Sequence, residues 1–185
     1  MRLFIAIEFS PELREEIQRW MRSLADEIPD PEHRLRWVKD EQLHLTLKFL
    51  GEVREDQLKP LSQVLRERTR DHMSFSLSAA RVGHFGGRVV WLGLETGLDN
   101  VASLAKSIEE GCASIGFTLE NRRFHPHITL ARSKVNPGTI RLANLPLHLR
   151  QKSFPPFRVT SISLIQSTLS ARGSLYETLE RFPLS

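Results

Sequence analysis

The chain has 185 residues, of which 40% are hydrophobic and 26% charged, as expected of a soluble globular domain and not of a fibrous or low-complexity chain. Its one cysteine, Cys112, excludes an internal disulfide framework. No apolar stretch is long enough to span a bilayer, and the first apolar run stops at Glu8, too short for a signal-peptide core, so we expect a cytosolic (cytoplasmic) protein.

The net charge of +4 is unevenly distributed, because no acidic residue lies between Glu120 and Glu177. This acid-free segment carries nine basic residues: Arg122, Arg123, Arg132, Lys134, Arg141, Arg150, Lys152, Arg158 and Arg172. A basic segment on a mildly acidic body suggests an anionic ligand, with phosphate or nucleic acid the leading candidates. A solvated basic face would explain the charge equally well.

The chain opens with a short apolar run, Leu3–Ile7, which predicts a buried strand. A helix is predicted to begin after Ser10, because a capping hydroxyl precedes a proline and an acidic residue in the first turn. Apolar residues then recur at helical spacing up to Ile28, and the prolines of 29–31 are expected to end the helix. Trp37–Val38 predicts a further short strand.

Leu43–Leu50 alternates between apolar and polar residues, as does a strand with one face on a core. We expect His44, Thr46 and Lys48 on one face and Phe49 with the leucines on the other. A second helix is marked by Leu58, Leu61, Val64 and Leu65.

Strands at Phe75–Ala79 and Arg88–Leu94 are predicted to form a hairpin around a turn at Gly83–Gly87. A third helix is expected from Leu98 to the glycine at Gly116, with the cysteine as a small core residue.

The β-branched content of His127–Ala131 predicts a strand, and the proline-punctuated Asn136–Pro156 a loop with one helical turn. Final strands are expected at Arg158–Gln166 and Leu175–Phe182, around a turn at Ser170–Gly173. This order mixes hairpins with helices, so it favours an α+β fold with antiparallel sheets.

One tetrapeptide pattern occurs twice, as His44-Leu45-Thr46-Leu47 and as His127-Ile128-Thr129-Leu130. Within a strand the histidine and the threonine share a face, while the aliphatic neighbours face the core. A single copy would be the ordinary wet side of a strand. Two copies favour a function, and two lobes related by approximate twofold symmetry would place both across a shared cleft.

Two histidines that face one cleft can perform the proton transfers of phosphodiester cleavage. One removes a proton from the attacking oxygen and the other protonates the leaving oxygen, and an ordinary pKa near 6.5 suits both tasks. The hydroxyls of Thr46 and Thr129 can donate to non-bridging phosphate oxygens. Arg132 suits a bidentate phosphate clamp, although a surface arginine at a strand end would look the same.

The segments Leu43–Gly51 and Pro126–Arg132 together resemble the signature pair of the 2H phosphoesterase superfamily. Within it, the chain resembles the bacterial and archaeal RNA 2′,3′-cyclic phosphodiesterases, also called 2′-5′ RNA ligases. The resemblance spans nearly the whole chain and includes Arg2–Ile7, Trp37-Val38, Val89–Gly93, Leu164–Ser167, Gly173 and Tyr176. Ala171 stands where similar proteins often have proline, which affects only a turn.

The resemblance implies one domain over residues 1–185, made of two pseudo-symmetric lobes. Each lobe would be an antiparallel sheet flanked by helices, with the active site in the cleft between them. It implies His44 as the proton donor, His127 as the proton acceptor, and Thr46, Thr129 and Arg132 as phosphate-binding residues. It implies no metal and no other cofactor.

The implied reaction is hydrolysis of RNA 2′,3′-cyclic phosphate ends to 2′-phosphomonoesters, with reversible 2′-5′ ligation through the same histidines. The implied partners are RNA with such ends or cyclic nucleotides, and no membrane. We expect a monomer.

Two alternatives remain open at this stage. The same fold could hold RNA ends or a nucleotide without turnover, which loss of either histidine would have favoured. A metallohydrolase could use His125 and His127, whose H-x-H spacing occurs in metal sites, although the acid-free segment offers no carboxylate ligand. His84-Phe85 could stack on a base, but an exposed aromatic residue in a hairpin turn is the more ordinary interpretation.

Overall fold

The structure is a computed structural model that describes residues 1–28, 35–133, 142–170 and 173–185. The described helices are α1 (Pro11–Glu27), α2 (Glu55–Arg70), α3 (Leu98–Ser114), α4 (Leu147–Arg150) and the 3₁₀ turns η1 (Asp40–Gln42) and η2 (Leu142–Asn144). The described strands are β1 (Arg2–Glu8), β2 (Leu35–Trp37), β3 (His44–Glu52), β4 (Phe75–Phe85), β5 (Val89–Thr96), β6 (Ile128–Ser133), β7 (Phe157–Val159), β8 (Ser161–Ser170) and β9 (Gly173–Pro183).

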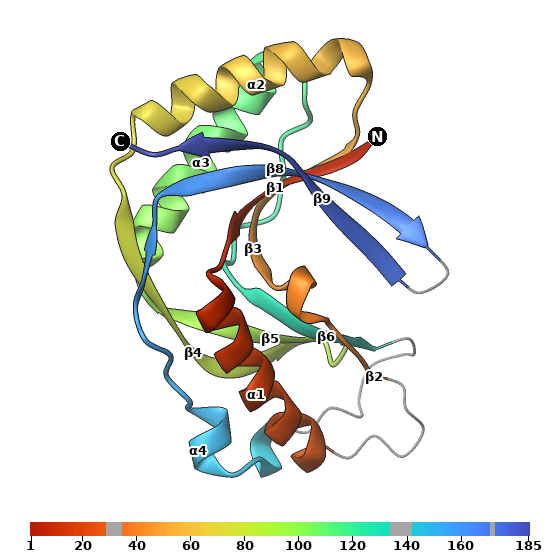
Figure 1. The fold of residues 1–185 in the computed structure, drawn as a ribbon, viewed down its shortest axis with the longest axis vertical. Coiled ribbons are helices and arrows are strands. Elements are labelled where there is room, and N and C mark those ends of the chain that lie inside the picture. Colours follow the sequence, from red (N-terminus) through yellow and green to blue (C-terminus); the bar gives the residue numbers. More distant parts are fainter. Residues whose placement is uncertain (29–34, 134–141, 171–172) are drawn as a thin grey trace.

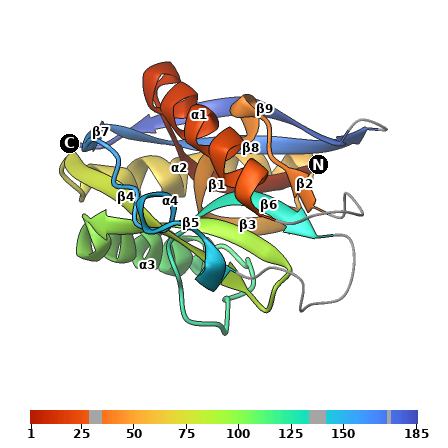
Figure 2. The same ribbon diagram turned by 90° about the horizontal axis from the view of Figure 1, so that it is seen from below.

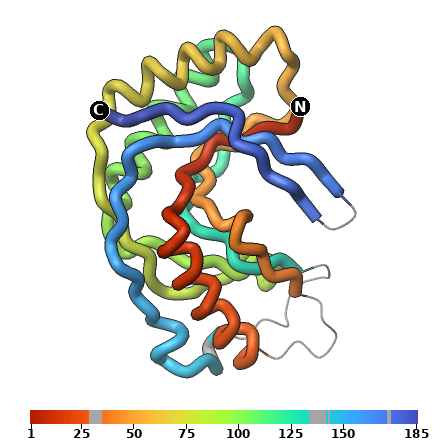
Figure 3. Tube along the Cα trace, viewed as in Figure 1, coloured from red at the N-terminus to blue at the C-terminus, as the bar shows by residue number. Residues whose placement is uncertain are grey.

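The described strands form one sheet of nine, in the order β7-β4-β5-β6-β3-β1-β8-β9, with β2 beside β6 (Figure 1). Every pairing is antiparallel, so the predicted α+β class is confirmed. The expectation of a separate sheet in each lobe is corrected. Strands β3 and β6 pair with each other, which joins two halves into a continuous curled sheet (Figure 3).

The helices divide between the two halves of the sheet. Helix α2 packs on β9 and against α3, which lies on β3, whereas α4 packs on β4 and against α1 (Figures 1 and 2). None of the helices within the described ranges is both long enough and apolar enough to cross a membrane.

Strand β1 is buried on both of its faces, which explains its uninterrupted apolar run. Leu3, Ile5 and Ile7 lie in the main core, whereas Phe4 and Ala6 point to the other face of the sheet. There Phe4 and Ala6 form a small second cluster with Ile165 and Tyr176. Alternate residues of a strand point to opposite faces, so a strand covered on both sides must be apolar throughout.

Helix α1 begins as the sequence predicts. The Ser10 hydroxyl accepts a hydrogen bond from the Leu13 backbone N–H at 3.3 Å, which satisfies one of the unpaired donors of the first turn. Trp20 is buried against the second half of the sheet, where its indole N–H donates to the Leu149 carbonyl at 3.2 Å. The helix ends at Glu27, and the prolines of 29–31 lie outside the described residues.

Several predicted boundaries move. Strand β4 continues to Phe85, so the turn of its hairpin with β5 is confined to Gly86-Gly87 and Arg88, with φ of +52° and +67° at the glycines. Predicted strand 158–166 is two strands, because β7 pairs with β4 while β8 crosses to pair with β1. Within the predicted 136–156 loop, residues 136–141 lie outside the described residues, and the described part contains η2 and the short helix α4. The middle of the 170–173 turn is not described.

The predicted alternation of β3 fails at its centre. Lys48, expected on the polar face, is 5% exposed, while Phe49, expected in the core, is 67% exposed. The Lys48 ammonium is compensated by a 2.7 Å ion pair with Glu109 and a 3.0 Å hydrogen bond to the Thr118 carbonyl. The cause is a bulge in β3 at Leu47, described below with the site.

Lys48→Ala should lower the free energy of unfolding by about 3 kcal/mol, because it removes one partner of a largely buried ion pair and leaves the other uncompensated. Lys106→Ala is the matched control, since Lys106 forms an exposed i,i+4 pair with Glu110. The control should change stability by at most about 0.5 kcal/mol. Urea unfolding of both variants measures the difference. Equal effects would contradict a structural role for the Lys48 pair.

Candidate active site

The two histidine–threonine motifs lie on neighbouring strands. Leu45 of β3 and Ile128 of β6 are direct partners, and both are completely buried in the main core. Because adjacent residues of a strand alternate, His44 and Thr46 on one strand and His127 and Thr129 on the other belong to the opposite face. We call this face of the sheet the site face.

Each motif strand contains a β-bulge at the same position of its motif. In β3, Thr46 and Lys48 oppose consecutive residues of β1, so Leu47 is the extra residue. In β6, Thr129 and Ala131 oppose consecutive residues of β5, so Leu130 is the extra residue. A bulge places two neighbouring side chains on the same face, and the alternation resumes with reversed parity.

The bulges decide which residues reach the site face beyond the threonines. The leucine and the residue after it both turn to the core, as the burial of Lys48 and Ala131 shows. The third residue after each threonine therefore returns to the site face. In β3 this residue is Phe49 and in β6 it is Arg132, and both are exposed.

The His44 ring is held by its own strand and by η1. Its Nδ1 lies 2.8 Å from the Gln42 carbonyl oxygen, which can only accept, so Nδ1 carries the proton of the neutral ring. Its Nε2 then accepts from the Thr46 hydroxyl at 3.1 Å. The Nε2 atom is thus the one available for proton transfer on the site face.

The His127 ring is held in the same way. Its Nδ1 lies 2.7 Å from the His125 carbonyl oxygen, two residues earlier, as Gln42 is two residues before His44. This bond fixes the same tautomer, so Nε2 is again the nitrogen without a proton. The two motifs therefore orient their imidazoles through the same kind of Nδ1–carbonyl bond.

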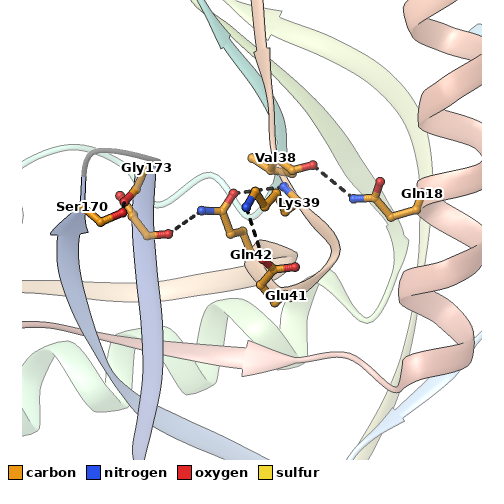
Figure 4. Close-up of polar contacts among 8 residues, drawn as sticks. Gln18, Val38, Lys39, Glu41, Gln42, Ser170 and Gly173 are labelled. Atoms are coloured by element: carbon orange, nitrogen blue, oxygen red, sulfur yellow. Dashed lines mark hydrogen bonds and ion pairs between the residues drawn. The ribbon is translucent and has the colours of Figure 1, made fainter.

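Gln42 connects the His44 support to the β8–β9 hairpin. Its side-chain amide donates to the Ser174 carbonyl at 2.7 Å, and its side-chain oxygen accepts from the Lys39 N–H at 3.0 Å. Figure 4 shows Gln42 lying between Lys39 and the Ser170–Gly173 end of the hairpin. The hairpin is thereby held close to the segment that orients His44.

Aromatic rings pack against both imidazoles. Phe4 and Tyr176 lie 4.8 and 5.4 Å from the His44 ring, between ring centroids. Phe85 meets the His127 ring edge-on at 4.9 Å and stacks against Trp91 at 5.2 Å. Trp91 in turn lies over Gly83, where an added Cβ would come within 2.2 Å of the indole, so this strand position requires glycine.

Burial makes both imidazoles poor bases. Removal from water lowers the pKa of His44 to about 4, and the positive charges of Arg132 and His127 lower it further, against the raising effects of the Gln42 carbonyl and Glu8. Burial likewise lowers the pKa of His127, with His125 and Arg132 adding to the decrease and the bond to the His125 carbonyl opposing it. Arg132 therefore contributes to the lowered pKa of both rings.

Glu8 is the carboxylate closest in register to His44, since the two residues are direct partners across β1 and β3. Burial tends to raise its pKa, but hydrogen bonds from Ser163, Arg181 and Thr178 and the charge of Arg181 outweigh this and hold the pKa below its usual value. Glu8 is thus an anion held beside His44.

The site residues predicted from the sequence thus share the site face, and the structure adds several that the sequence analysis missed. Glu8 gave no signal, Phe49 was expected in the core, and Phe4 and Tyr176 appeared only within the segments of the family resemblance. His84 accepts a hydrogen bond from the Gly87 N–H at 3.1 Å and serves the hairpin turn, while its neighbour Phe85 contacts the site.

The H-x-H pair lacks a further ligand in the described part of the chain. The His125 and His127 rings are 6.5 Å apart between centroids, and no group of three His, Cys, Asp or Glu side chains gathers there or elsewhere in the described residues.

The described basic residues of the acid-free segment lie on different parts of the fold. Lys152 pairs with Glu16 of α1 at 3.2 Å, and Arg122 pairs with Glu120 at 3.5 Å. Arg158 lies on β7 at the outer edge of the sheet, whereas Arg132 lies at the site. Lys134, Arg141 and Arg172 lie outside the described residues. Residues that are close in sequence are thus separated in the fold, and Arg132 is placed with the histidines.

A family model described as the 2′-5′ RNA ligase superfamily matches residues 9–170. The chain belongs to this superfamily. The resemblance drawn from the two motifs is therefore confirmed.

Relatives within the 2′-5′ RNA ligase superfamily align over their full length. An RNA 2′,3′-cyclic phosphodiesterase of Escherichia coli is 35% identical over 191 residues, which cover 100% of this chain and 97% of the relative. One of Methanothermobacter thermautotrophicus is 31% identical over 188 residues, which cover 100% and 99%.

Solved structures of this superfamily match the whole fold. Escherichia coli LigT complexed with 3′-AMP has a TM-score of 0.81 and 34% sequence identity, covering 100% of this chain and 98% of that one. LigT complexed with phosphate has a TM-score of 0.76 and 33% identity, covering 100% and 97%.

Stability should fall in acid because of the lowered pKa of His44. An unfolded histidine takes up its proton near pH 6.5, whereas His44 in the folded chain does so only near pH 4. Between these values the unfolded chain binds more protons, so the free energy of unfolding decreases as the pH is lowered. Urea unfolding at several pH values should show a shallower decrease for His44→Gln than for the wild type. An unchanged slope would contradict the lowered pKa.

Proposed function

We propose that the chain hydrolyses RNA 2′,3′-cyclic phosphate ends to 2′-phosphomonoesters, with His44 as general acid and His127 as general base. The observation that carries the proposal is the pairing of the two motif strands, which places two imidazoles of the same tautomer on one face. The full-length relatives named RNA 2′,3′-cyclic phosphodiesterases support the substrate class.

In the proposed reaction, Nε2 of His127 takes a proton from water as the water oxygen forms a bond to phosphorus. The bond from phosphorus to the ribose 3′ oxygen breaks, and that oxygen receives the proton of His44 Nε2. The hydroxyls of Thr46 and Thr129 and the guanidinium of Arg132 stabilise the charge that develops on the non-bridging oxygens. The threonines donate to phosphate in place of the resting contact seen at His44.

The lowered pKa values suit an anionic substrate. Before binding, Arg132 and burial disfavour a second positive charge, so both imidazoles are neutral at neutral pH. A bound phosphodiester supplies a negative charge next to both rings, which favours the protonated form of one of them. The substrate thus creates the protonated acid that its own cleavage requires.

The nature of the substrate follows from its chemistry. A 2′,3′-cyclic phosphate forms only where a ribose 2′-OH is present, so DNA 3′ ends cannot be substrates. Reversal of the same steps would join a cyclic end to a 5′-hydroxyl in a 2′-5′ bond.

A binding protein without turnover is disfavoured, because both imidazoles are present and share one tautomer. We expect the protein to act as a monomer on cytoplasmic RNA ends or cyclic nucleotides.

His44→Ala and His127→Ala should each lower turnover of a short RNA with a 2′,3′-cyclic phosphate by roughly 10²–10⁴-fold, as expected on loss of a general acid or base. Thr46→Ala and Thr129→Ala should cost less, because they remove neutral donors. Phosphorus NMR of the product should show a 2′-phosphomonoester. A 3′-phosphate would reverse the proposed orientation, and full activity of either histidine variant would exclude the two-histidine mechanism.

The pH dependence should differ between the free and the loaded protein. One imidazole must be protonated and the other neutral, so kcat/KM should be bell-shaped with a maximum below pH 6.5, set by the coupled pair in the free protein. The bound anion raises the pKa of the pair, so the kcat maximum should lie at higher pH. Steady-state kinetics from pH 4 to 9 test this, and coincident maxima would contradict it.

A further inference from the structure

A second arginine lies directly beside Arg132 on the site face. Arg36 of β2 is the direct antiparallel partner of Arg132, and residues directly opposite in a sheet point to the same face. The neighbours of Arg36 support this orientation. Leu35 and Trp37 pack against the main core, so the exposed Arg36 between them points away from it.

Arg36 and Arg132 bring two positive charges to neighbouring positions of the site face. Within the described ranges, neither Arg36 nor Arg132 forms an ion pair with a carboxylate, whereas Arg14 and Arg181 each do. Like charges directly opposite each other in a sheet are destabilising. A second anion bound between the two arginines would relieve this repulsion.

The path along the sheet shows where this anion would lie. Strand β6 pairs with β3 at Ile128 and with β2 from Ala131 onward, so β2 continues the edge beyond the motifs. Arg132 is three residues beyond Thr129, but because Leu130 is an extra residue, the two are separated by about two strand steps, or roughly 7 Å. Arg36 lies a further ~5 Å away, on the neighbouring strand. Both arginine side chains are long enough to bridge neighbouring phosphates of one RNA strand.

We propose that Arg36 binds the phosphodiester one nucleotide to the 5′ side of the cyclic phosphate, so that the protein prefers RNA ends over cyclic mononucleotides. The inference rests on the proposed function, because it takes the terminal phosphate to be held by Arg132 and the threonines. A guanidinium suits this task, since its planar donors bind two phosphate oxygens together. The ligand is the RNA backbone and not the base, so no sequence preference follows.

The test compares two substrates that differ by one nucleotide on the 5′ side, and thus by one phosphodiester: uridine 2′,3′-cyclic phosphate and the dinucleotide UpU carrying the same cyclic end. Arg36→Gln should raise KM for the dinucleotide about ten-fold, because it removes a charged contact made equally in the ground and transition states. Its kcat/KM for the mononucleotide should equal that of the wild type. Arg36→Lys should retain part of the preference, because it keeps the charge without the planar fork.

Arg158→Gln is the matched control. Arg158 is also the central, exposed residue of a three-residue strand whose neighbours pack on the core, but β7 lies at the far edge of the sheet. Arg158→Gln should leave KM and kcat/KM for both substrates unchanged. For the dinucleotide, Arg36→Gln should also lessen the salt dependence by about one released counterion.

The outcomes separate this inference from the proposed function. Equal loss on both substrates would show that Arg36 serves the fold or the reacting phosphate and would overturn the inference, as would no loss on either. A similar rise in KM for the dinucleotide in Arg158→Gln would show that the effect comes from net charge alone, and would also overturn the inference. If the wild type turns over neither substrate, the proposed function itself fails.

Discussion

The site depends on one packing constraint, the insertion of a leucine as an extra residue in each motif strand. Leu47 and Leu130 both face the core, together with the residue that follows each. This reverses the alternation of the strand, which brings Phe49 on one side and Arg132 on the other to the face that carries the imidazoles. The fourth position of each motif is therefore apolar because its side chain packs in the core. The residues that reach the site face beyond the threonines follow from this packing.

The electrostatics of the site follow from the same arrangement. Burial of the two imidazoles, together with the charge of Arg132 that the bulge in β6 places on the site face, disfavours protonated imidazole in the absence of a ligand. A bound anion favours the protonated form of an imidazole instead. Glu8 adds a fixed negative charge beside His44 but not beside His127 in the register, which gives the two chemically similar rings unequal surroundings.

The sequence was sufficient for the elements that depend on local patterns and insufficient for those that depend on pairing. Ser10-Pro11 and the helical apolar spacing predicted α1, and the repeated tetrapeptide located both histidines. The burial of Lys48 and the exposure of Phe49 could not be predicted, because a bulge is defined by the partner strand and not by the strand itself. The juxtaposition of Arg36 and Arg132, far apart in sequence, likewise depends on strand register.

The central claim is that His44 and His127 act on one bound phosphate. Titration of the protein with a nucleoside 2′-monophosphate, followed by NMR of the histidine ring carbons, tests it most directly. The account predicts that the resonances of both rings shift with the same dissociation constant and that the pKa of each rises when the ligand is bound. A response of only one ring, or binding that leaves both pKa values unchanged, would contradict a shared site.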